Sequence, residues 1–584
     1  MISLRSADGS SVRTEHEEQA RVRITGLCFE LVIFLEVCCL CAGQGFAQNP
    51  QPENQPNTVR GTVVNAVTHE PIGRALVYSP DNRYATMTDG EGHFEFVLPK
   101  AASDSGGFLS TGVGSQLSWL MARKPGFLDD QPGGRQVEVT PGTEVTIPLI
   151  PEALIKGRIA LPAAEPVRGI DVQLFFRQVQ DGSFRWLPRN SVRTNSNGEF
   201  RFAELHPGSY KVLTREWMDN DPEASVPGGQ LYGYPPVYYP SATDFAAAST
   251  IQVTGGQTFV ADLSLVRQPY YPVSIPVTNM EPNGGLNVTV SLQGQRGPGY
   301  SLGYNRGKDA IEGQLPNGKY LVEGSMYGLV SMSGSVNIAV AGAPASGAGM
   351  VLARNNSISV NVKEEFTSTD RMSSPSWSDG NHTYPLHAAR LDLQIRAEGM
   401  DDFGTQRSVY VRDPAGANDD SLVLENLVPG RYWLRLTANR GYVASATMGG
   451  MDLLREPLVV VPGASASIDV IMRDDGAELE GTLLGVPATP AAPGRWSPPG
   501  FVYCIPLPDS SGQFLELSAS PDGKFDHRTV TPGVYRVIAF STPQHDLPYR
   551  DAEAMKAYEA KGQIVHFAPG QKVTLQLQTI SGSE

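Results

Sequence analysis

The residues best suited to chemistry lie in one long segment, residues 215–245, with the sequence REWMDNDPEASVPGGQLYGYPPVYYPSATDF. Flat aromatic rings stack on the apolar faces of sugar rings, and carboxylates accept hydrogen bonds from sugar hydroxyls. The segment therefore predicts a carbohydrate-binding loop, whose candidate ligand-binding residues are Trp217, Tyr232, Tyr234, Tyr238, Tyr239 and Asp244. The alternative is that the segment folds against the end of its own domain or against a neighbouring domain.

A polar insert at residues 366–386 adds Trp377, in a Ser-rich setting, as a further candidate for ligand contact. The alternative for this insert is a solvated surface loop.

The stretch TDGEGHFEF, residues 88–96, raises the question of a calcium loop at Asp89 and Glu91. Such a loop needs more oxygen ligands at alternating positions and a distal acidic residue. The equivalent turns NSNGEF and SPDGKF retain too few of them, so we predict a hairpin turn and no metal site.

No catalytic centre is predicted. Nucleophile-elbow, phosphate-loop and dinucleotide motifs are lacking in the sequence, and so is His-Glu-x-x-His. We therefore expect no cofactor and no enzyme activity, with an unrecognised hydrolase as the open alternative. The histidines after residue 47 are scattered at His69, His93, His206, His382, His387, His527, His545 and His566.

Charge excludes one class of partner. The net charge is −15, so the chain lacks the basic surface that nucleic acids require. Gly (61 residues) and Pro (45 residues) are abundant, which is typical of many turns between short strands.

The first 47 residues resemble a secretory leader. Arg21 and Arg23 precede an apolar stretch that ends in a small-x-small pattern at Ala47. Two carboxylates within that stretch, Glu30 and Glu36, make a permanent membrane span costly. We therefore expect a cleaved leader, export and no membrane span in the mature chain; an uncleaved anchor and a lipid-modified cysteine are the alternatives.

Cleavage would leave Cys504 as the single cysteine of the exported chain, so we expect no intramolecular disulfide. Its apolar surroundings, FVYCIPL, indicate a buried small side chain.

A repeated pattern organises the remaining chain. Alternating strands follow a polar turn with Gly and an aromatic residue, and a Pro-Gly or Asn-Gly turn comes next, with Tyr two residues after its Gly. These tyrosines are Tyr210, Tyr320, Tyr432 and Tyr535. Opening strands such as VRGTVV and closing strands such as VTPGTEVTIPL recur about every hundred residues, the size of one β-sandwich.

This pattern predicts an all-β fold: a tandem array of about five small antiparallel, prealbumin-like sandwiches with one short helix at residues 549–562. The predicted divisions are a signal peptide (1–47), a linker (48–57) and sandwiches at 58–151, 152–267 (with the aromatic insert), 268–353 (short and atypical), 354–473 (with the polar insert) and 474–584.

The first sandwich resembles the carboxypeptidase regulatory-like domain, a transthyretin-like fold. The matching residues are Gly61, Glu70, Pro71, Ala75, Val77, Asp89, Gly92 and Phe94. The array as a whole resembles exported multi-domain bacterial proteins with starch-binding-like folds. The resemblance implies carbohydrate binding by analogy of fold and carries no peptidase centre.

Two functions remain open on the sequence. The first is a non-catalytic exported protein that binds a glycan or another surface polymer through its loop aromatics. The second is a structural or adhesive spacer at the cell surface that contacts other proteins. The compartment is expected to be the periplasm, the cell surface or the medium.

Overall fold

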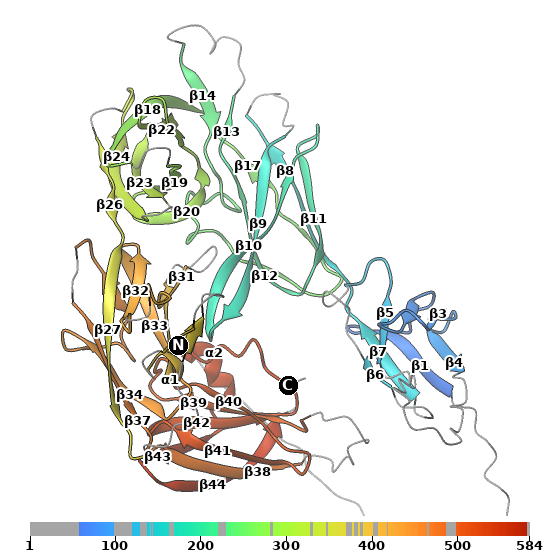
Figure 1. Ribbon diagram of the computed structural model, residues 1–584. Coiled ribbons are helices and arrows are strands. Elements are labelled where there is room, and N and C mark those ends of the chain that lie inside the picture. The colour runs from blue at the N-terminus through green and yellow to red at the C-terminus, as the bar shows by residue number, and fades with distance from the viewer. Residues whose placement is uncertain are drawn as a thin grey trace, which may run out of the picture.

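The structure, a computed structural model, is built almost entirely of β-strands (Figure 1). It describes residues 58–97, 119–128, 137–139, 142, 144–162, 169–219, 229–280, 284–326, 331–345, 348–368, 376–378, 383–385, 389–400, 407–416, 419–463, 466–485 and 498–580. The predicted all-β fold class is confirmed. The predicted leader and linker lie outside the described residues.

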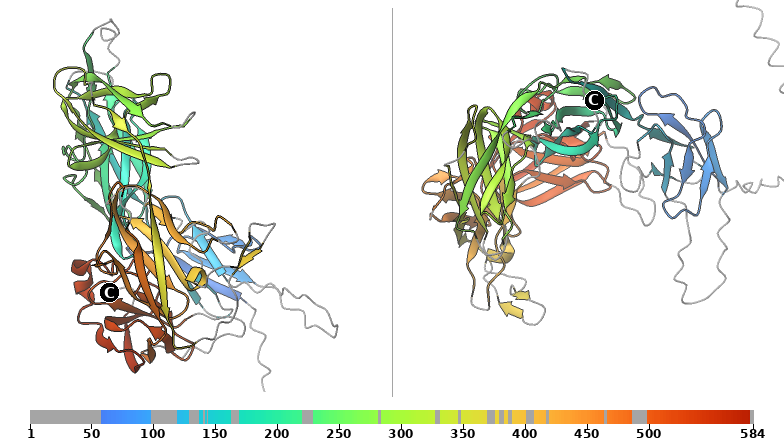
Figure 2. Two further views of the ribbon diagram at one scale, coloured as in Figure 1. Left: turned by 60° about the vertical axis from the view of Figure 1, so that its left-hand side comes forward. Right: turned by 90° about the horizontal axis from the view of Figure 1, so that it is seen from above.

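Buried apolar side chains gather in five successive stretches, residues 59–149, 153–265, 273–352, 358–472 and 477–580. We call these units one to five. Units two to five lie together, whereas unit one stands to one side of unit two (Figures 1 and 2).

Unit one contains two sheets, with strand orders β4-β1-β7 and β3-β2-β5-β6. Its strands are β1 (Thr58–Asn65), β2 (Leu76–Tyr78), β3 (Ala85–Met87), β4 (His93–Val97), β5 (Trp119–Arg123), β6 (Val137–Glu138) and β7 (Glu144–Leu149).

Unit two pairs a sheet of order β10-β9-β12-β15 with a second sheet of order β11-β8-β16. Its strands are β8 (Ala153–Ala160), β9 (Asp171–Gln180), β10 (Ser183–Arg193), β11 (Glu199–Leu205), β12 (Gly208–Thr214), β15 (Ile251–Val253), β16 (Thr258–Val260) and β17 (Leu263–Ser264). Two strands from the same stretch of chain, β13 (Trp217–Met218) and β14 (Leu231–Tyr234), leave this sandwich.

Unit three takes up those two strands in a sheet of order β13-β14-β18-β22-β21, opposite a sheet of order β20-β19-β23-β24-β26. Its own strands are β18 (Gln268–Thr278), β19 (Asn287–Leu292), β20 (Gln295–Tyr300), β21 (Gly303–Asn305), β22 (Ala310–Pro316), β23 (Gly318–Met326), β24 (Met332–Val340), β25 (Met350–Val351) and β26 (Ala353–Arg354).

Unit four has sheets of order β32-β27-β37-β34-β35 and β31-β30-β33-β36, and a two-stranded β28-β29 ribbon. Its elements are β27 (Asn356–Glu365), β28 (Ser376–Ser378), β29 (Thr383–Pro385), α1 (Ala389–Asp392), β30 (Leu393–Gly399), β31 (Ser408–Tyr410), β32 (Leu422–Leu427), β33 (Gly430–Ala438), β34 (Tyr442–Met448), β35 (Met451–Asp452), β36 (Leu458–Val460) and β37 (Ile468–Arg473).

Unit five contains the sheet of order β40-β39-β42-β44-β38-β41, with β43 also paired to β42. Its elements are β38 (Ala477–Leu484), β39 (Phe501–Pro506), β40 (Leu515–Ser518), β41 (Lys524–Val530), β42 (Gly533–Phe540), α2 (Ala552–Met555), a 3-10 turn (Lys556–Tyr558), β43 (Gln563–Phe567) and β44 (Lys572–Ile580).

The short helix expected at 549–562 is present but covers a single α-turn and a 3-10 turn. Asp551 begins it, because its carboxylate accepts hydrogen bonds from the backbone N–H groups of Glu553 and Ala554. Met555 anchors the helix by packing into a small core against one face of unit five. The four-residue helix α1 was not predicted.

Each unit repeats one strand plan. The opening strand lies in the middle of its sheet and pairs antiparallel with the strand of the aromatic hairpin, as β1 does with β4 and β38 does with β41. On its other side it pairs in parallel with the closing strand, as β1 does with β7 and β38 does with β44. The predicted antiparallel sandwiches thus also contain parallel pairs, which alternation alone does not reveal because parallel neighbours need a long crossover.

The four tyrosines singled out from the repeat share one contact. Each is almost fully buried, and each hydroxyl donates a hydrogen bond to the carbonyl four residues earlier. The pairs are Tyr210 with His206 (2.8 Å), Tyr320 with Pro316 (2.9 Å), Tyr432 with Val428 (2.7 Å) and Tyr535 with Thr531 (2.9 Å). The hydroxyl thus closes the turn while the ring fills the core, a tyrosine corner repeated in four units.

The glycine of the opening strand and the aromatic residue of the hairpin also meet. A Cβ on Gly157 would lie 2.7 Å from the ring of Phe200, and one on Gly481 would lie 2.2 Å from the ring of Phe525. Both positions therefore require glycine because the ring occupies the space of a side chain.

The stretch TDGEGHFEF forms a turn whose acidic side chain serves the backbone. Asp89 accepts hydrogen bonds from the N–H groups of Glu91 (2.9 Å) and His93 (2.8 Å). In the equivalent turn of unit two, the neutral side chain of Asn195 accepts from Asn197 and Glu199 at the same spacing. The oxygen needed at this position is thus a turn acceptor, and charge is not required.

Candidate functional sites

The first half of the aromatic segment forms a joint between units two and three. Trp217 pairs with Tyr234 in the β13–β14 ladder, and their rings stack with centroids 5.5 Å apart. Strand β14 then pairs antiparallel with β18 of unit three. Tyr234 has no exposed surface and belongs to the core of unit two. The two units are therefore linked by hydrogen-bonded strands as well as by the chain itself.

The second half of the segment covers the outer face of the β9–β12 sheet. Tyr238 is 3% exposed, and its hydroxyl donates to the carbonyl of Pro298 in unit three at 2.5 Å. Phe245 packs edge-on against Phe175, with ring centroids 5.1 Å apart. Lys211 of β12 holds this segment on the sheet, because its buried ammonium donates a hydrogen bond to the carbonyl of Phe245 at 2.7 Å.

Burial lowers the pKa of Lys211, while the carboxylate of Asp244 acts in the opposite direction. The ammonium also lies 5.1 Å from the ring centre of Trp186 and 4.8 Å from that of Phe245. Two aromatic rings and the carbonyls of Phe245 and Ala246 (2.7 and 3.5 Å) thus replace the water that the charge has lost.

The remaining candidate residues also have protein partners. Arg267 lies 4.2 Å from the ring centre of Tyr232 and forms an ion pair with Asp219 at 2.6 Å. Tyr239 packs edge-on against Phe259, and Asp244 accepts a hydrogen bond from the backbone of Ala247.

The structure brings the predicted aromatics together as a joint between units, with Tyr234 and Tyr238 inside it. Trp217, Tyr232 and Tyr239 are half-buried and keep some open surface. Trp377 lies on β28 opposite Tyr384, and its side chain is outside the described part of the molecule. Ligand binding by these residues stays a prediction.

A carboxyl group lies inside the same joint and was missed from the sequence. Glu216 accepts a hydrogen bond from the backbone N–H of Ser301 in unit three at 2.6 Å, and its own N–H donates to the carbonyl of Gly299. Burial raises the pKa of Glu216 to about 7, and the nearby Tyr300 has its pKa raised to about 12. No local motif marked Glu216, because its partners come from another unit.

A second joint connects unit two with units four and five. The β9–β10 hairpin ends in the turn Asp181-Gly182, and both residues have positive φ (49° and 75°). Figure 1 shows this hairpin extending from unit two toward α2 and β33. The Asp181 carboxylate meets Arg435 at 3.0 Å and Arg396 at 3.6 Å, both on unit four.

Glu398 supports this arrangement from within unit four. It is 2% exposed and forms ion pairs with both Arg396 and Arg435. Farther along the hairpin, buried Arg185 donates to the carbonyl of Gly399 at 3.2 Å. The joint therefore combines an ionic network of two carboxylates and two guanidinium groups with a hydrogen bond from Arg185 to the backbone of unit four.

Unit five closes the same joint. The backbone N–H of Arg550 donates to the carbonyl of Gly182 at 3.0 Å, and the ring of Tyr549 fills the space where a Gly182 side chain would lie. Arg550 also forms an ion pair with Asp509 at 3.5 Å, and burial raises the pKa of that carboxyl group.

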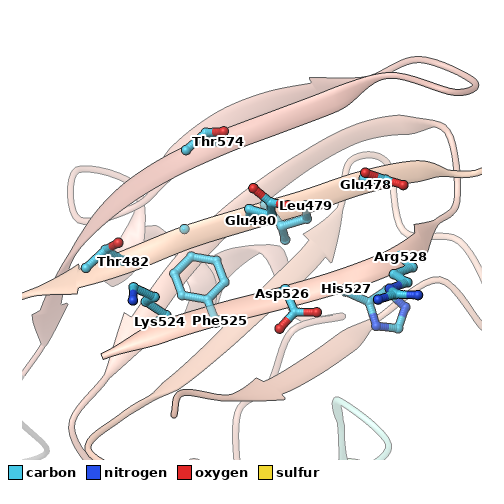
Figure 3. Close-up of a pocket in the computed structure, with 11 residues that line it drawn as sticks. Glu478, Leu479, Glu480, Thr482, Lys524, Phe525, Asp526, His527, Arg528 and Thr574 are labelled. Atoms are coloured by element: carbon cyan, nitrogen blue, oxygen red, sulfur yellow. The ribbon is translucent and has the colours of Figure 1, made fainter. Parts of the chain in front are cut away.

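The outer face of the last sheet forms a shallow groove over β38, β41 and β44 (Figure 3). Glu480 lies between Asp526 and Thr574 in the strand register, and Lys572 forms an ion pair with Glu480. Charges of both signs alternate here along exposed strands, which is typical of a solvated sheet face.

Cys504 is fully buried, and burial raises the pKa of its thiol to about 12. At neutral pH it is therefore a protonated core residue. Among the described residues, no group of three or more His, Cys, Asp or Glu side chains is placed to hold a metal ion. None of the helices in the described ranges is long and apolar enough to cross a membrane.

The fold and its joints define an all-β protein of several sandwiches, four of which contact one another. No family model and no curated protein matches the sequence. Among solved structures, the chain is similar to the Bacillus anthracis TIE protein, with 10% identity, a TM-score of 0.13, and coverage of 72% of this chain and 73% of that chain.

It is also similar to the full-length RrgB pilus protein from Streptococcus pneumoniae, with 8% identity, a TM-score of 0.12, and coverage of 74% and 98%. A third is the shaft pilin SpaA from Lactobacillus rhamnosus GG, with 10% identity, a TM-score of 0.17, and coverage of 37% and 98%.

Proposed function

We propose that the protein is an exported structural and adhesive protein of the cell surface without a catalytic role. Units two to five act in this proposal as one rigid block, which holds unit one and several open sheet faces toward other molecules.

One observation carries the proposal: unit two is joined to three other units by contacts that are far apart in the sequence. Strand β14 continues the sheet of unit three, and the Asp181-Gly182 turn contacts units four and five. Flexible linkers would suit a chain of independent binding modules, whereas fixed joints suit a spacer that keeps a defined shape.

Unit one is proposed to be a carboxypeptidase regulatory-like module for contact with other proteins. Two features support this: the ring of Phe94 lies against Gly61, so the residues that carry the resemblance are in contact, and the unit stands apart from the block.

Limited proteolysis combined with small-angle X-ray scattering tests the rigid block. We expect cleavage between units one and two and a resistant fragment that begins near residue 151 and contains units two to five. The scattering curve should fit one arrangement of those four units. Five separate fragments of about one hundred residues, or scattering that requires mobile units, would contradict the proposal.

Labelling of intact cells with a membrane-impermeant amine reagent tests the location. A surface protein is labelled at its exposed lysines, whereas labelling that appears only after lysis places the protein inside the envelope.

A further inference from the structure

The outer face of the β31-β30-β33 sheet in unit four is only half covered. In the strand register, Glu398 lies opposite Trp433, Arg396 opposite Arg435, and Gln394 opposite Thr437. The Asp181 turn reaches the Arg396–Arg435 row, and Arg550 of unit five lies over Trp433, 5.3 Å from its ring centre. The Gln394–Thr437 row is exposed and forms the floor of a groove that also reaches Arg396.

The lining of this groove is rich in arginine side chains. Its lining contains four arginines and one acidic residue, Asp413, in a protein whose net charge is −15. The arginines are Arg390, Arg396, Arg412 and Arg435. The carboxylates that pair with them are Asp181, Glu398, Asp419 and Glu425, and none of these four lines the groove.

The guanidinium groups are also fixed in position. Arg412 forms ion pairs with Asp419 and, at 2.8 Å, with Glu425, and Arg412 holds the pKa of Asp419 well below its usual range. Arg390 donates to the carbonyls of Arg412 (3.0 Å) and Ser421. Donors that are held in place by such a network lose little entropy when they bind an acceptor.

An exposed ring stands at the edge of the groove. Tyr410 on β31 is 60% exposed, one of the most exposed large hydrophobic side chains in the described part of the chain. The Arg396 guanidinium lies 5.8 Å from its ring centre. Exposed aromatic rings beside fixed polar groups are the usual means of binding a sugar ring.

We propose that this groove binds a carboxylate-bearing oligosaccharide, with a sugar ring on Tyr410, its carboxylate near Arg396 and Arg412, and its hydroxyls at Gln394 and Thr437. The central strands of the floor have their backbone groups in the sheet ladder, so side chains make the contacts. A glycan with both rings and charges matches them better than an extended peptide, which relies on free main-chain partners. The proposal names a ligand for the proposed adhesive role and rests on that role.

The test is a titration of the full exported chain with tetragalacturonate, in which binding is measured by calorimetry or by tyrosine fluorescence. Maltotetraose serves as the uncharged sugar and tetraglutamate as the charged peptide. Saturable binding of tetragalacturonate that weakens with added salt, and at least tenfold weaker binding of the other two, is the expected result.

Two variants locate the binding. Gln394→Glu adds one negative charge to the groove floor with almost no change of shape, and we expect roughly tenfold weaker binding. Tyr410→Ala removes the exposed ring, with a similar expected loss. Gln576→Glu, at an exposed position of β44 in unit five, is the matched control and should bind as the unchanged protein does.

Absence of saturable binding, or equal binding by the Gln394→Glu variant, would overturn the assignment of the groove. Equal binding of tetraglutamate would show that the groove recognises negative charge alone. It would therefore overturn the proposal that the ligand is an oligosaccharide. The proteolysis and scattering results do not depend on this ligand, so failure here is distinguishable from failure of the proposed structural role.

Discussion

At the joint between units two and three, Trp217 stacks on a fully buried Tyr234 and strand β14 extends the neighbouring sheet. At the joint of unit two with units four and five, a hairpin turn instead places Asp181 between two arginines and a backbone carbonyl of Gly182 against unit five. The first joint depends on apolar burial and strand pairing, and the second on charges and a few hydrogen bonds. The two should therefore respond to different perturbations.

The stabilisation from buried aromatic rings is insensitive to salt, and its loss lowers the free energy of unfolding strongly. Partly exposed ion pairs contribute little to that free energy and are screened by salt. The comparison suggests that the aromatic joint sets the permanent geometry of the block. The ionic joint then fixes how units four and five are held against unit two.

The largest expected effect comes from Tyr234→Ala. Removal of a fully buried ring leaves a cavity, and such changes cost about 3–5 kcal/mol. We expect the midpoint temperature of the first thermal unfolding transition to fall by several degrees. We also expect the chain segment between units two and three to become sensitive to protease. Tyr232→Ala, which removes a half-buried ring from the same strand, is the control and should cost much less. Equal effects of the two changes would show that burial at this joint is not what stabilises it.

The next effect is a pH dependence from Glu216. Its pKa is about 7 in the folded protein, above the value of 4.5 in the unfolded chain, so the folded state binds more protons between these values. The free energy of unfolding should therefore fall as the pH rises from 4.5 to 7, by on the order of 3 kcal/mol, with no further loss above 7.

Glu216→Gln removes that titration and keeps an oxygen for the Ser301 N–H, so the variant should be more stable than the unchanged protein at pH 8 and similar at pH 4.5. Chemical denaturation at the two pH values measures the difference. A parallel loss in both proteins would assign the pH dependence to other groups.

Much of the fold could be predicted because its signals are local. Alternation at period two gave the strands, and Tyr210, Tyr320, Tyr432 and Tyr535 marked the same turn in four units. The parallel pairing of opening and closing strands could not be predicted, since a strand with one buried face alternates in the same way in either direction.

The joints were only partly visible for the same reason. Aromatic density marked residues 215–245 as unusual, and packing against a neighbouring domain was one of the two interpretations. No local signal singled out Asp181-Gly182 or Glu216, because their partners are 85 or more positions away. Tyr410 was also not predicted as a binding residue, because the alternation of its strand is ordinary.

A smaller effect is expected from Tyr432→Phe. The ring stays in the core of unit four, and the hydrogen bond to the Val428 carbonyl (2.7 Å) is lost. One such bond contributes roughly 1 kcal/mol, and the carbonyl is left without its donor. Tyr442→Phe, whose hydroxyl instead bonds the Asp475 side chain, offers a comparison within the same unit. If Tyr432→Phe lowered the unfolding temperature more than Tyr234→Ala does, closure of the turn would contribute more to stability than burial of the ring, contrary to the expected order.

The smallest change in stability, but a visible change in shape, is expected from Asp181→Asn. The variant removes the charge that meets Arg396 and Arg435, and partly exposed pairs of this kind contribute about 1 kcal/mol or less. Because those arginines keep their contacts with Glu398, unit four should remain folded while the hairpin turn separates from it more often. Scattering should then show a larger mean radius of gyration, and 1 M salt should produce the same change in the unchanged protein.

The control is Asp171→Asn, which breaks an exposed ion pair with Arg193 at the start of the same strand β9. This variant should leave the radius of gyration unaltered. If salt and Asp181→Asn both leave the radius unchanged, backbone contacts such as Arg550 to Gly182 hold the joint, and the contrast between an apolar and an ionic joint is wrong.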